Sequence, residues 1–314
     1  MEGQRGDTVP VFLKAADLRI DGRAKLIDVR ETAVYAAGHL RDAINIPDLF
    51  TYLLSTSSND DVQRMKSHFR KRFSDLGIGQ DEHVVIYEQT MDHQYGASCR
   101  GFFLFKLMNY GKVSTLEGGL DAFTRIPGNE QHLTCDPTTI VPRHSDGVDG
   151  DQVEWQMANR EEVLDVVTER PAKTYLLDVR DAVEWNGLSS SPYGIDFSPR
   201  KGRIPHSVWL EWYSFHRLDR EKNITELKST VEVETMLRDK GIGKDDRIIV
   251  YCFKGSRASL VVMKLKEAHF KNVKNYFGSW NEWAADPQLP IDATVFQSIG
   301  ALDRGDYSAT ENQG

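Results

Sequence analysis

Cysteine is scarce in this chain, because only three of its 314 residues are cysteines. Three cysteines cannot build the disulfide framework of a small secreted domain, and none of them forms a Cys-x-x-Cys pair of the kind that holds structural zinc. We therefore expect reduced thiols and neither a metal nor another cofactor. Reduced thiols suit a cytoplasmic location, and an organelle matrix stays open as the alternative.

Long apolar runs and an excess of positive charge are also missing. No segment approaches the roughly 18 consecutive apolar residues of a membrane helix, and residues 1–8 (MEGQRGDT) lack the apolar core of a secretory signal. The formal net charge is −8, so the surface as a whole does not attract nucleic acid or anionic membranes. We expect a monomer or a weak dimer with neither of these partners.

The chain does contain a duplicated pattern. Four segments of the first half recur in the same order in the second half: LIDVR at 26–30 and LLDVR at 176–180, LGIG at 76–79 and KGIG at 240–243, VVIYE at 84–88 and IIVYC at 248–252, and LEGGLDAF at 116–123 and YFGSWNEW at 276–283. Each half alternates short apolar strands with amphipathic helices, which is typical of a parallel sheet flanked by helices. The sequence therefore predicts an α/β protein with two similar domains.

Composition predicts where these domains begin and end. Residues 1–140 are the first domain and residues 151–292 the second. Residues 141–150 lack apolar periodicity and are predicted to be a linker, and the polar residues 293–314 are predicted to be a tail. The elements expected in the second domain are strands at 174–179, 208–210, 248–251 and 274–277 and helices at 231–240 and 258–265.

The most informative segment is RIIVYCFKGSR at 247–257. A buried β-branched strand that feeds a helix through a short loop places Cys252 at the carboxyl edge of a parallel sheet. There the sulfur faces the N-terminus of the helix, whose backbone N–H groups stabilise an anion. Because the thiolate is the nucleophilic form of cysteine, we expect Cys252 to be reactive and to face an opening. Gly255 permits the tight curvature or positive φ of such a loop.

A purely structural interpretation competes with this one. Most lone cysteines are small buried hydrophobic residues, and we interpret Cys99 and Cys135 in this way. Cys252 differs from them because Lys254 and Arg257 lie within the same turn. A structural cysteine has no need of two cations, so their presence favours a reactive sulfur.

These pieces together resemble the tandem-domain rhodanese family of sulfurtransferases over nearly the whole chain. The resemblance rests on Asp-Val-Arg near the start of each half, GHLRDAINIP at 38–47 with a looser copy GRIPHSVWL at 202–210, EGG at 117–119, and the loop CFKGSR at 252–257. Each piece alone is weakly specific, whereas the ordered and duplicated set is strong. The resemblance implies two tandem rhodanese-like domains, of which the second is catalytic.

The resemblance also implies a reaction. Glu88 stands in the first half where Cys252 stands in the second, so the first half is expected only to shape the pocket, with the substrate in the cleft between the halves. In the implied reaction the Cys252 thiolate takes the outer sulfur of thiosulfate as a persulfide and releases sulfite. A small-molecule acceptor, cyanide or a thiol, then removes this sulfur.

Roles for the loop residues follow from the implied reaction. Lys254 is expected to hold the sulfonate end of the donor, and Arg257 to brace the loop or neutralise the persulfide. The backbone N–H groups from Phe253 through Gly255 and Ser256 to Arg257 are expected to stabilise the anionic sulfur.

The Asp178 and Arg180 pair lies at the end of a neighbouring strand. In the family's pattern it orients the loop and faces the cleft, and an ion pair that caps the strand is the alternative. The tandem enzymes usually carry a second substrate arginine four residues beyond the first, where this chain has Glu184. This sign reversal disfavours 3-mercaptopyruvate, whose carboxylate loses a cationic clamp. Three nearby cations are candidates to replace the clamp: Arg200, Lys201 and Arg203.

Three alternatives to a thiosulfate enzyme stay open. The first is a 3-mercaptopyruvate sulfurtransferase, which Lys254 disfavours because the loops of those enzymes carry small neutral residues. The second is a phosphatase or arsenate reductase of the related fold, whose cysteine and arginine are separated by five residues, whereas four separate Cys252 from Arg257. The third is a non-catalytic binding module, against which the cations beside Cys252 count.

Overall fold

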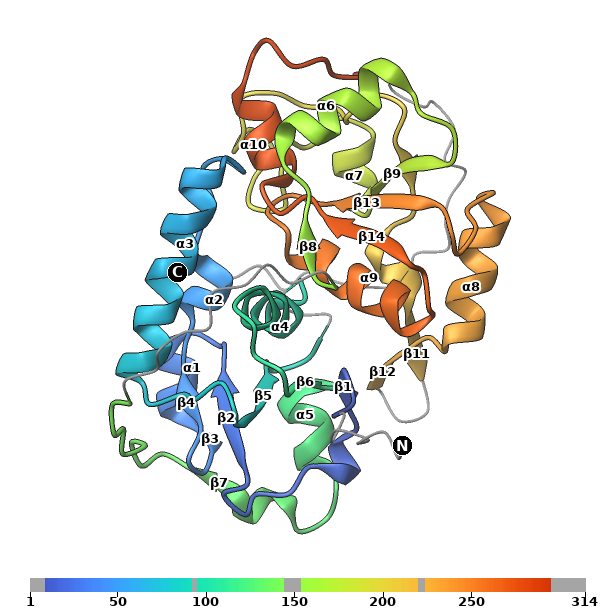
Figure 1. Cartoon of the computed structure of the whole chain (residues 1–314). Helices are drawn as coiled ribbons and strands as arrows, with labels where there is room; N and C mark the ends of the chain where they lie inside the picture. Colours follow the sequence, from blue (N-terminus) through green and yellow to red (C-terminus); the bar gives the residue numbers. More distant parts are fainter. Residues whose placement is uncertain (1–8, 92–94, 144–153, 220–223, 295–314) are drawn as a thin grey trace, which may run out of the picture.

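Two five-stranded parallel sheets organise the chain in a computed structural model that describes residues 9–91, 95–143, 154–219 and 224–294 (Figure 1). The first sheet has the order β1 (Phe12–Leu13), β6 (Val113–Leu116), β5 (His83–Tyr87), β2 (Ala24–Asp28) and β4 (Ile44–Asn45). The second has the order β8 (Gln156–Met157), β14 (Asn272–Asn275), β13 (Arg247–Tyr251), β9 (Thr174–Asp178) and β10 (Val208–Trp209). The two orders are the same when the halves are aligned, so the predicted α/β fold with a sheet in each half is confirmed.

Helices flank both sheets. Those of the first half are α1 (Thr32–Ala37), α2 (Asp48–Thr51), α3 (Asn59–Asp75), α4 (Ala97–Leu107) and α5 (Gly119–Thr124), with 3-10 turns at Ala15–Asp17 and Asn129–His132. Those of the second half are α6 (Arg160–Glu169), α7 (Ala182–Trp185), α8 (Thr230–Asp239), α9 (Ser256–Glu267) and α10 (Ser279–Ala285), with a 3-10 turn at Trp212–Phe215. Two antiparallel pairs complete the described elements: β3 (His39–Leu40) with β7 (Leu133–Thr134), and β11 (His216–Asp219) with β12 (Ile224–Leu227).

The elements predicted in the second half are present, with small shifts at their ends. The strand predicted at 274–277 is β14 at Asn272–Asn275, and the helix predicted at 258–265 begins earlier, at Ser256. Gly241 follows α8 with φ +78 and donates its N–H to the carbonyl of Arg238 (2.8 Å), the C-terminal position that favours glycine. Most of the predicted linker and tail, residues 144–150 and 295–314, lies outside the described residues.

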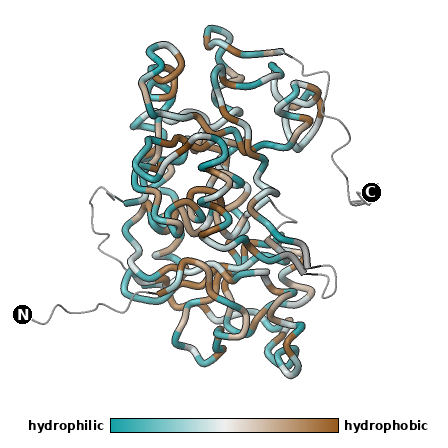
Figure 2. Tube along the Cα trace, turned by 90° about the vertical axis from the view of Figure 1, so that its right-hand side faces the viewer, coloured by the Kyte–Doolittle hydropathy of each residue, from teal (hydrophilic) through white to brown (hydrophobic). Residues whose placement is uncertain are grey.

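Helices α4 and α9 lie side by side between the two sheets (Figure 1). Helix α4 is buried on every side except at Lys106, and α9 is buried from Ser256 to Leu265. A helix that is apolar all round needs cover on all faces, and here each helix covers the other as well as its own sheet. One hydrophobic core cluster therefore contains residues of both halves, and brown hydrophobic segments gather in the middle of the trace in Figure 2.

Polar contacts also join the halves at this packing surface. The Glu282 carboxylate accepts hydrogen bonds from the Ser57 N–H (2.7 Å) and hydroxyl (3.0 Å). Ser256, at the start of α9, donates its hydroxyl proton to the carbonyl of Gly96, just before α4 (3.2 Å). The N-termini of α4 and α9 therefore meet, which brings the first half against the loop that holds Cys252.

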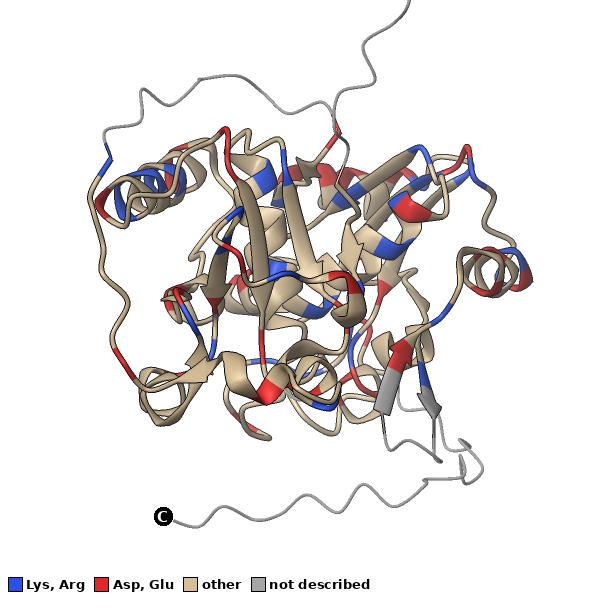
Figure 3. Ribbon diagram, turned by 90° about the horizontal axis from the view of Figure 1, so that it is seen from below, with Lys and Arg blue, Asp and Glu red and all other residues tan. Residues whose placement is uncertain are grey.

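Charged residues of both signs are interspersed along the helices and loops around the sheets (Figure 3). In the described part of the chain, no helix combines the length and the apolar character needed to cross a bilayer. The same residues include no group of three or more His, Cys, Asp or Glu side chains placed to hold a metal ion.

Candidate active site

Cys252 stands where β13 has ended and α9 has not yet begun, at the carboxyl edge of the second sheet. The Cys252 Sγ accepts a hydrogen bond from the Gly255 N–H (3.2 Å). Gly255 has φ +85, and a Cβ there would lie 2.8 Å from the Phe277 ring and 2.9 Å from the Phe277 carbonyl oxygen. Glycine is therefore required at this position for both its conformation and its size. The other loop N–H groups stay predicted partners of the sulfur.

The sulfur does not face an opening, in contrast to the expectation from the sequence. Cys252 is 1% exposed. The insertion at residues 187–201 contacts the loop that holds Cys252, because the Tyr193 and Phe197 rings pack edge-on against Phe253 at centroid distances of 5.5 and 5.7 Å. Phe253 is therefore the surface on which this segment rests, and we call residues 187–201 the covering segment.

Lys254 lies between aromatic rings of both halves. Its Nζ is 3.9 Å from the centroid of the Phe50 ring and 4.9 Å from that of Tyr193. Burial first and the charge of Arg100 second lower the pKa of Lys254 to about 7, and Cys252 acts in the opposite direction. The cation that the sequence assigned to the donor is thus held beside the sulfur, with a charge that depends on pH near neutrality.

Arg100 is a second cation at this site, and the sequence analysis did not identify it. It comes from α4 of the first half, is fully buried, and donates to the carbonyls of Lys254 (3.3 Å), Leu49 (2.6 Å) and Tyr52 (2.8 Å). Carbonyl oxygens solvate its charge without neutralising it, and burial lowers its pKa only to about 10. Among the described residues, no carboxylate pairs with Lys254 or Arg100, so both contribute positive potential at Cys252.

Arg257 has a different environment. Its guanidinium forms a two-point ion pair with Glu184 (2.6 and 3.0 Å) and also bonds the Asp181 carboxylate (2.8 Å). Two carboxylates neutralise one guanidinium here, so Arg257 ties α9 to α7 and adds no net positive charge at the sulfur. This arrangement corresponds to the bracing role expected from the sequence, and it leaves no arginine directed at an anion as a phosphatase loop would need.

Asp178 and Arg180 form an internal ion pair at 0% exposure. Arg180 binds the Asp178 carboxylate (2.6 Å) and the Gly202 carbonyl (2.9 Å), and Tyr251 donates its hydroxyl proton to the same carboxylate (2.6 Å). Both side chains are buried in this arrangement, and a substrate contact at Arg180 stays a prediction.

The first half repeats this internal ion pair, although Glu88 stands there in place of Cys252. Arg30 binds Asp28 (2.6 Å) and the Gly38 carbonyl (2.7 Å), and Asp28 lies opposite Tyr87 in the strand pairing as Asp178 lies opposite Tyr251. Because the half without a catalytic cysteine also has this ion pair, the pair does not depend on the catalytic cysteine. We therefore assign the Asp-Val-Arg motif a structural role, in which it stabilises the end of the strand in each half.

Glu88 occupies the place of Cys252 in the first half. Its carboxylate accepts the N–H groups of Ala97 (3.2 Å) and Ser98 (2.9 Å) and the Ser98 hydroxyl (2.5 Å). A carboxylate thus sits at the N-terminus of α4 as the sulfur sits at the N-terminus of α9, which shows that this position of the fold accommodates an anion.

The three cations considered as replacements for the second arginine are engaged elsewhere. Arg200 donates to the carbonyls of Ala284 (3.1 Å), Leu289 (2.7 Å) and Trp283 (2.6 Å). Lys201 pairs with Asp196 (2.7 Å), and Arg203 pairs with Asp292 (2.8 Å). None of these contacts involves the loop of Cys252.

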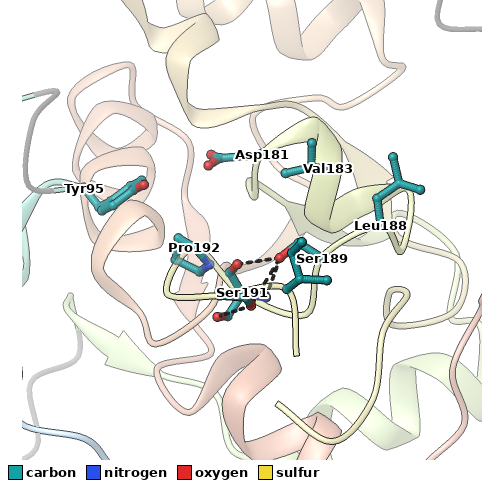
Figure 4. Close-up of a pocket in the computed structure, with 9 residues that line it drawn as sticks. Tyr95, Asp181, Val183, Leu188, Ser189, Ser191 and Pro192 are labelled. Carbon is teal, nitrogen blue, oxygen red and sulfur yellow. Dashed lines mark hydrogen bonds between the residues drawn. The ribbon is translucent and has the colours of Figure 1, made fainter. Parts of the chain in front are cut away.

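A cavity of about 430 Å³ lies beside the covering segment (Figure 4). Its lining contains Tyr95 from the first half, Asp181 and Val183 at the start of α7, and residues 188–195 in part, and it does not include Cys252. The cavity therefore belongs mainly to the second half, with Tyr95 as the one lining residue that the first half supplies among the described residues. A substrate cleft between the halves stays a prediction.

A single family model, that of the rhodanese-like domain, matches the chain twice, at residues 13–126 and 159–286. The 3-mercaptopyruvate sulfurtransferase of Escherichia coli (strain K12) is 26% identical over 269 residues, 82% of this chain and 84% of the relative. A putative thiosulfate sulfurtransferase of Haloferax volcanii is 27% identical over 275 residues, 87% of this chain and 90% of the relative.

Solved structures share the fold. The 3-mercaptopyruvate sulfotransferase SseA from Escherichia coli superposes with a TM-score of 0.67 at 23% identity, over 87% of this chain and 99% of SseA. Wild-type EanB superposes with a TM-score of 0.73 at 19% identity, over 94% of this chain, which spans 66% of the EanB chain.

Proposed function

This chain belongs to the family of proteins built from rhodanese-like domains, and on that premise we propose that it is a sulfurtransferase that carries sulfur as a persulfide on Cys252. The observation that carries the proposal is the contrast between the two halves at one position of the fold. The first half has a carboxyl group, Glu88, that accepts the Ser98 N–H, and the second has a thiol that accepts the Gly255 N–H. Lys254 and Arg100 add two cations beside this thiol alone.

In the proposed first step the Cys252 thiolate attacks the outer sulfur of thiosulfate. The bond between the two donor sulfur atoms breaks, and sulfite leaves with its electron pair. In the second step cyanide or a thiolate attacks the outer sulfur of the persulfide, and Cys252 returns to the thiolate. The loop N–H groups and the two cations stabilise the negative sulfur throughout.

Thiosulfate is the donor that the charges favour. Lys254 is a compact cation of the kind that binds a sulfonate as a point charge. A carboxylate such as that of 3-mercaptopyruvate is best held by a guanidinium that can bind it at two points. The carboxylates of Glu184 and Asp178 already occupy Arg257 and Arg180, and 3-mercaptopyruvate is therefore the second candidate.

Turnover also requires access to the sulfur. Cys252 is buried, and the covering segment contacts the adjacent Phe253, so a donor is expected to reach the sulfur when this segment moves. We therefore propose that residues 187–201 open and close during the reaction.

The test is to incubate the purified chain with thiosulfate and to measure labile sulfur by cyanolysis. We expect one sulfur per chain, its loss in Cys252→Ser, and its retention in Cys99→Ser and Cys135→Ser. Steady-state rates with thiosulfate and 3-mercaptopyruvate then decide the donor. A chain that gains no labile sulfur from either donor is a binding module instead.

A further inference from the structure

The cavity beside the covering segment has a lining that sulfur transfer from thiosulfate does not explain. Three large apolar side chains line it although water reaches them: Val183 is 47%, Leu188 59% and Ile195 62% exposed. Figure 4 shows Tyr95 on one side, Val183 and Leu188 on the other, and the Asp181 carboxylate between them. Exposed apolar side chains gathered around a hollow suit a ligand with an apolar body.

The serine hydroxyls of the cavity are not available to bind an anion. The Ser189 hydroxyl donates to the Ser191 carbonyl (2.8 Å), and the Ser191 hydroxyl donates to the Gly194 carbonyl (3.2 Å). These donors are consumed inside the covering segment, as the dashed lines of Figure 4 show. Among the described residues that line the cavity, Asp181 is the only charged one, and its side chain is 20% exposed.

The charges behind the lining are also negative in sum. Asp181 and Glu184 share the single guanidinium of Arg257. Glu211 lies beside the same group, where its carboxylate accepts the Ala182 N–H (3.1 Å), and burial followed by the nearby carboxylates raises its pKa. Carboxylates therefore outnumber the guanidinium, so the cavity repels anions such as thiosulfate and attracts cations.

We propose that this cavity is the site of the sulfur acceptor and that it takes an organic cation with an apolar body, such as an aminothiol. The ammonium group pairs with Asp181, and the carbon skeleton packs on Val183, Leu188 and Ile195. The inference rests on the proposed function, and it assigns the acceptor to a place away from the two cations that serve the donor. Because Cys252 does not line the cavity, the acceptor reaches the persulfide when the covering segment moves.

The transfer step balances without a further reagent. The acceptor thiolate attacks the outer sulfur of the Cys252 persulfide and forms a new S–S bond. The S–S bond to Cys252 breaks, and its electron pair leaves the Cys252 sulfur as a thiolate. The acceptor departs as a persulfide.

The experiment compares three thiols that differ in charge: 2-aminoethanethiol, 2-mercaptoethanol and 3-mercaptopropionate. We expect kcat/KM, expressed per thiolate, to be about tenfold higher for the aminothiol than for the carboxylate thiol, with the neutral thiol between them. In Asp181→Asn and in Ile195→Arg, we expect the ratio of kcat/KM for the aminothiol to kcat/KM for the carboxylate thiol to fall close to one. Ile140→Arg is the matched control, because Ile140 is 40% exposed and does not line the cavity.

Calorimetric titration of Cys252→Ser with benzyltrimethylammonium and with 3-phenylpropionate separates binding from turnover. Binding of the cation alone, lost in the Ile195→Arg background and kept in the Ile140→Arg background, supports the inference. Equal affinity for both probes, or no affinity for the cation, overturns it even when sulfur transfer proceeds. Cation binding in a chain that transfers no sulfur overturns the proposed function and leaves the cation site in place.

Discussion

Glu184 and Arg257 form a buried ion pair in which one guanidinium nitrogen donates to each carboxylate oxygen, Nη1 to Oε2 at 2.6 Å and Nη2 to Oε1 at 3.0 Å. The sequence alone presents Glu184 as the loss of a substrate arginine. The structure shows instead that it is the partner that fixes Arg257 at the start of α9. A residue such as Glu184, whose charge departs from the family pattern, can thus be the ion-pair partner of another residue in the same chain, here Arg257.

We expect Glu184→Gln to lower the free energy of unfolding by about 3 kcal/mol, because it removes one charge of a buried pair and leaves the other. Glu184→Arg is expected to be more severe, since it places two guanidinium groups together out of contact with water. Urea denaturation followed by fluorescence checks both. Glu169→Gln, an exposed position at the end of α6, is the control and is expected to change stability by less than about 0.5 kcal/mol. Equal urea midpoints for Glu184→Gln and Glu169→Gln would contradict the conclusion that the Glu184–Arg257 ion pair stabilises the fold.

Periodicity and repetition predicted most of the fold, because parallel strands such as β5 and β13 are buried on both faces and leave an unbroken apolar run in the sequence. The position of Cys252 and the positive φ of Gly255 followed from the same strand-loop-helix reasoning. The sequence analysis did not identify Arg100. A signal was present, because an arginine inside the apolar segment ASCRGFFLFKL is expected to be buried, and a buried charge needs partners.

Burial of the sulfur and the pairing of the arginines could not be predicted. Local patterns do not show that Tyr193 and Phe197, some 55 to 60 residues before Cys252 in the sequence, fold onto Phe253. Nor do they show that Arg257 faces Glu184. Both outcomes depend on how an irregular insertion packs, and such a segment has no periodicity from which its direction can be inferred.

Arg100 is expected to be needed for formation of the persulfide. Arg100→Met removes a buried positive charge and the hydrogen bond to the Lys254 carbonyl (3.3 Å), so we expect the rate of sulfur loading from thiosulfate to fall roughly 100-fold. Single-turnover cyanolysis measures this rate. Arg100→Lys keeps the charge and is expected to retain more of the rate than Arg100→Met. If Met and Lys variants load sulfur equally fast, the charge of Arg100 does not act on the sulfur.

Lys254 makes capture of the donor dependent on pH. Burial, followed by the charge of Arg100, lowers its pKa to about 7, so the ammonium is present below this pH and is lost as the pH rises above it. Thiosulfate is a dianion throughout this range, and we expect its binding to weaken from pH 6 to pH 9. Lys254→Arg stays charged, so the ratio of kcat/KM between wild type and this variant is expected to fall with rising pH. The ratio cancels other titrations that the two proteins share, and a constant ratio would show that Lys254 does not titrate in this range.

The covering segment sets how often the sulfur is reachable. Phe197 is 57% exposed and rests on Phe253 with one edge-on ring contact, so Phe197→Ala removes a contact of about 1 kcal/mol and costs the core little. We expect Cys252 to react with iodoacetamide up to about tenfold faster in this variant. The reason is that a smaller free energy then separates the arrangement in which the covering segment is closed from the one in which it is open. Peptide mass spectrometry after timed quenching follows Cys252 separately from Cys135. Cys135 is exposed, so its interpretation from the sequence as a buried residue was wrong, and it serves as the internal reference. Val231→Ala, at an exposed site on α8, should leave both rates unchanged. If Phe197→Ala accelerates Cys135 as much as Cys252, the chain has loosened as a whole and the covering segment is not the gate.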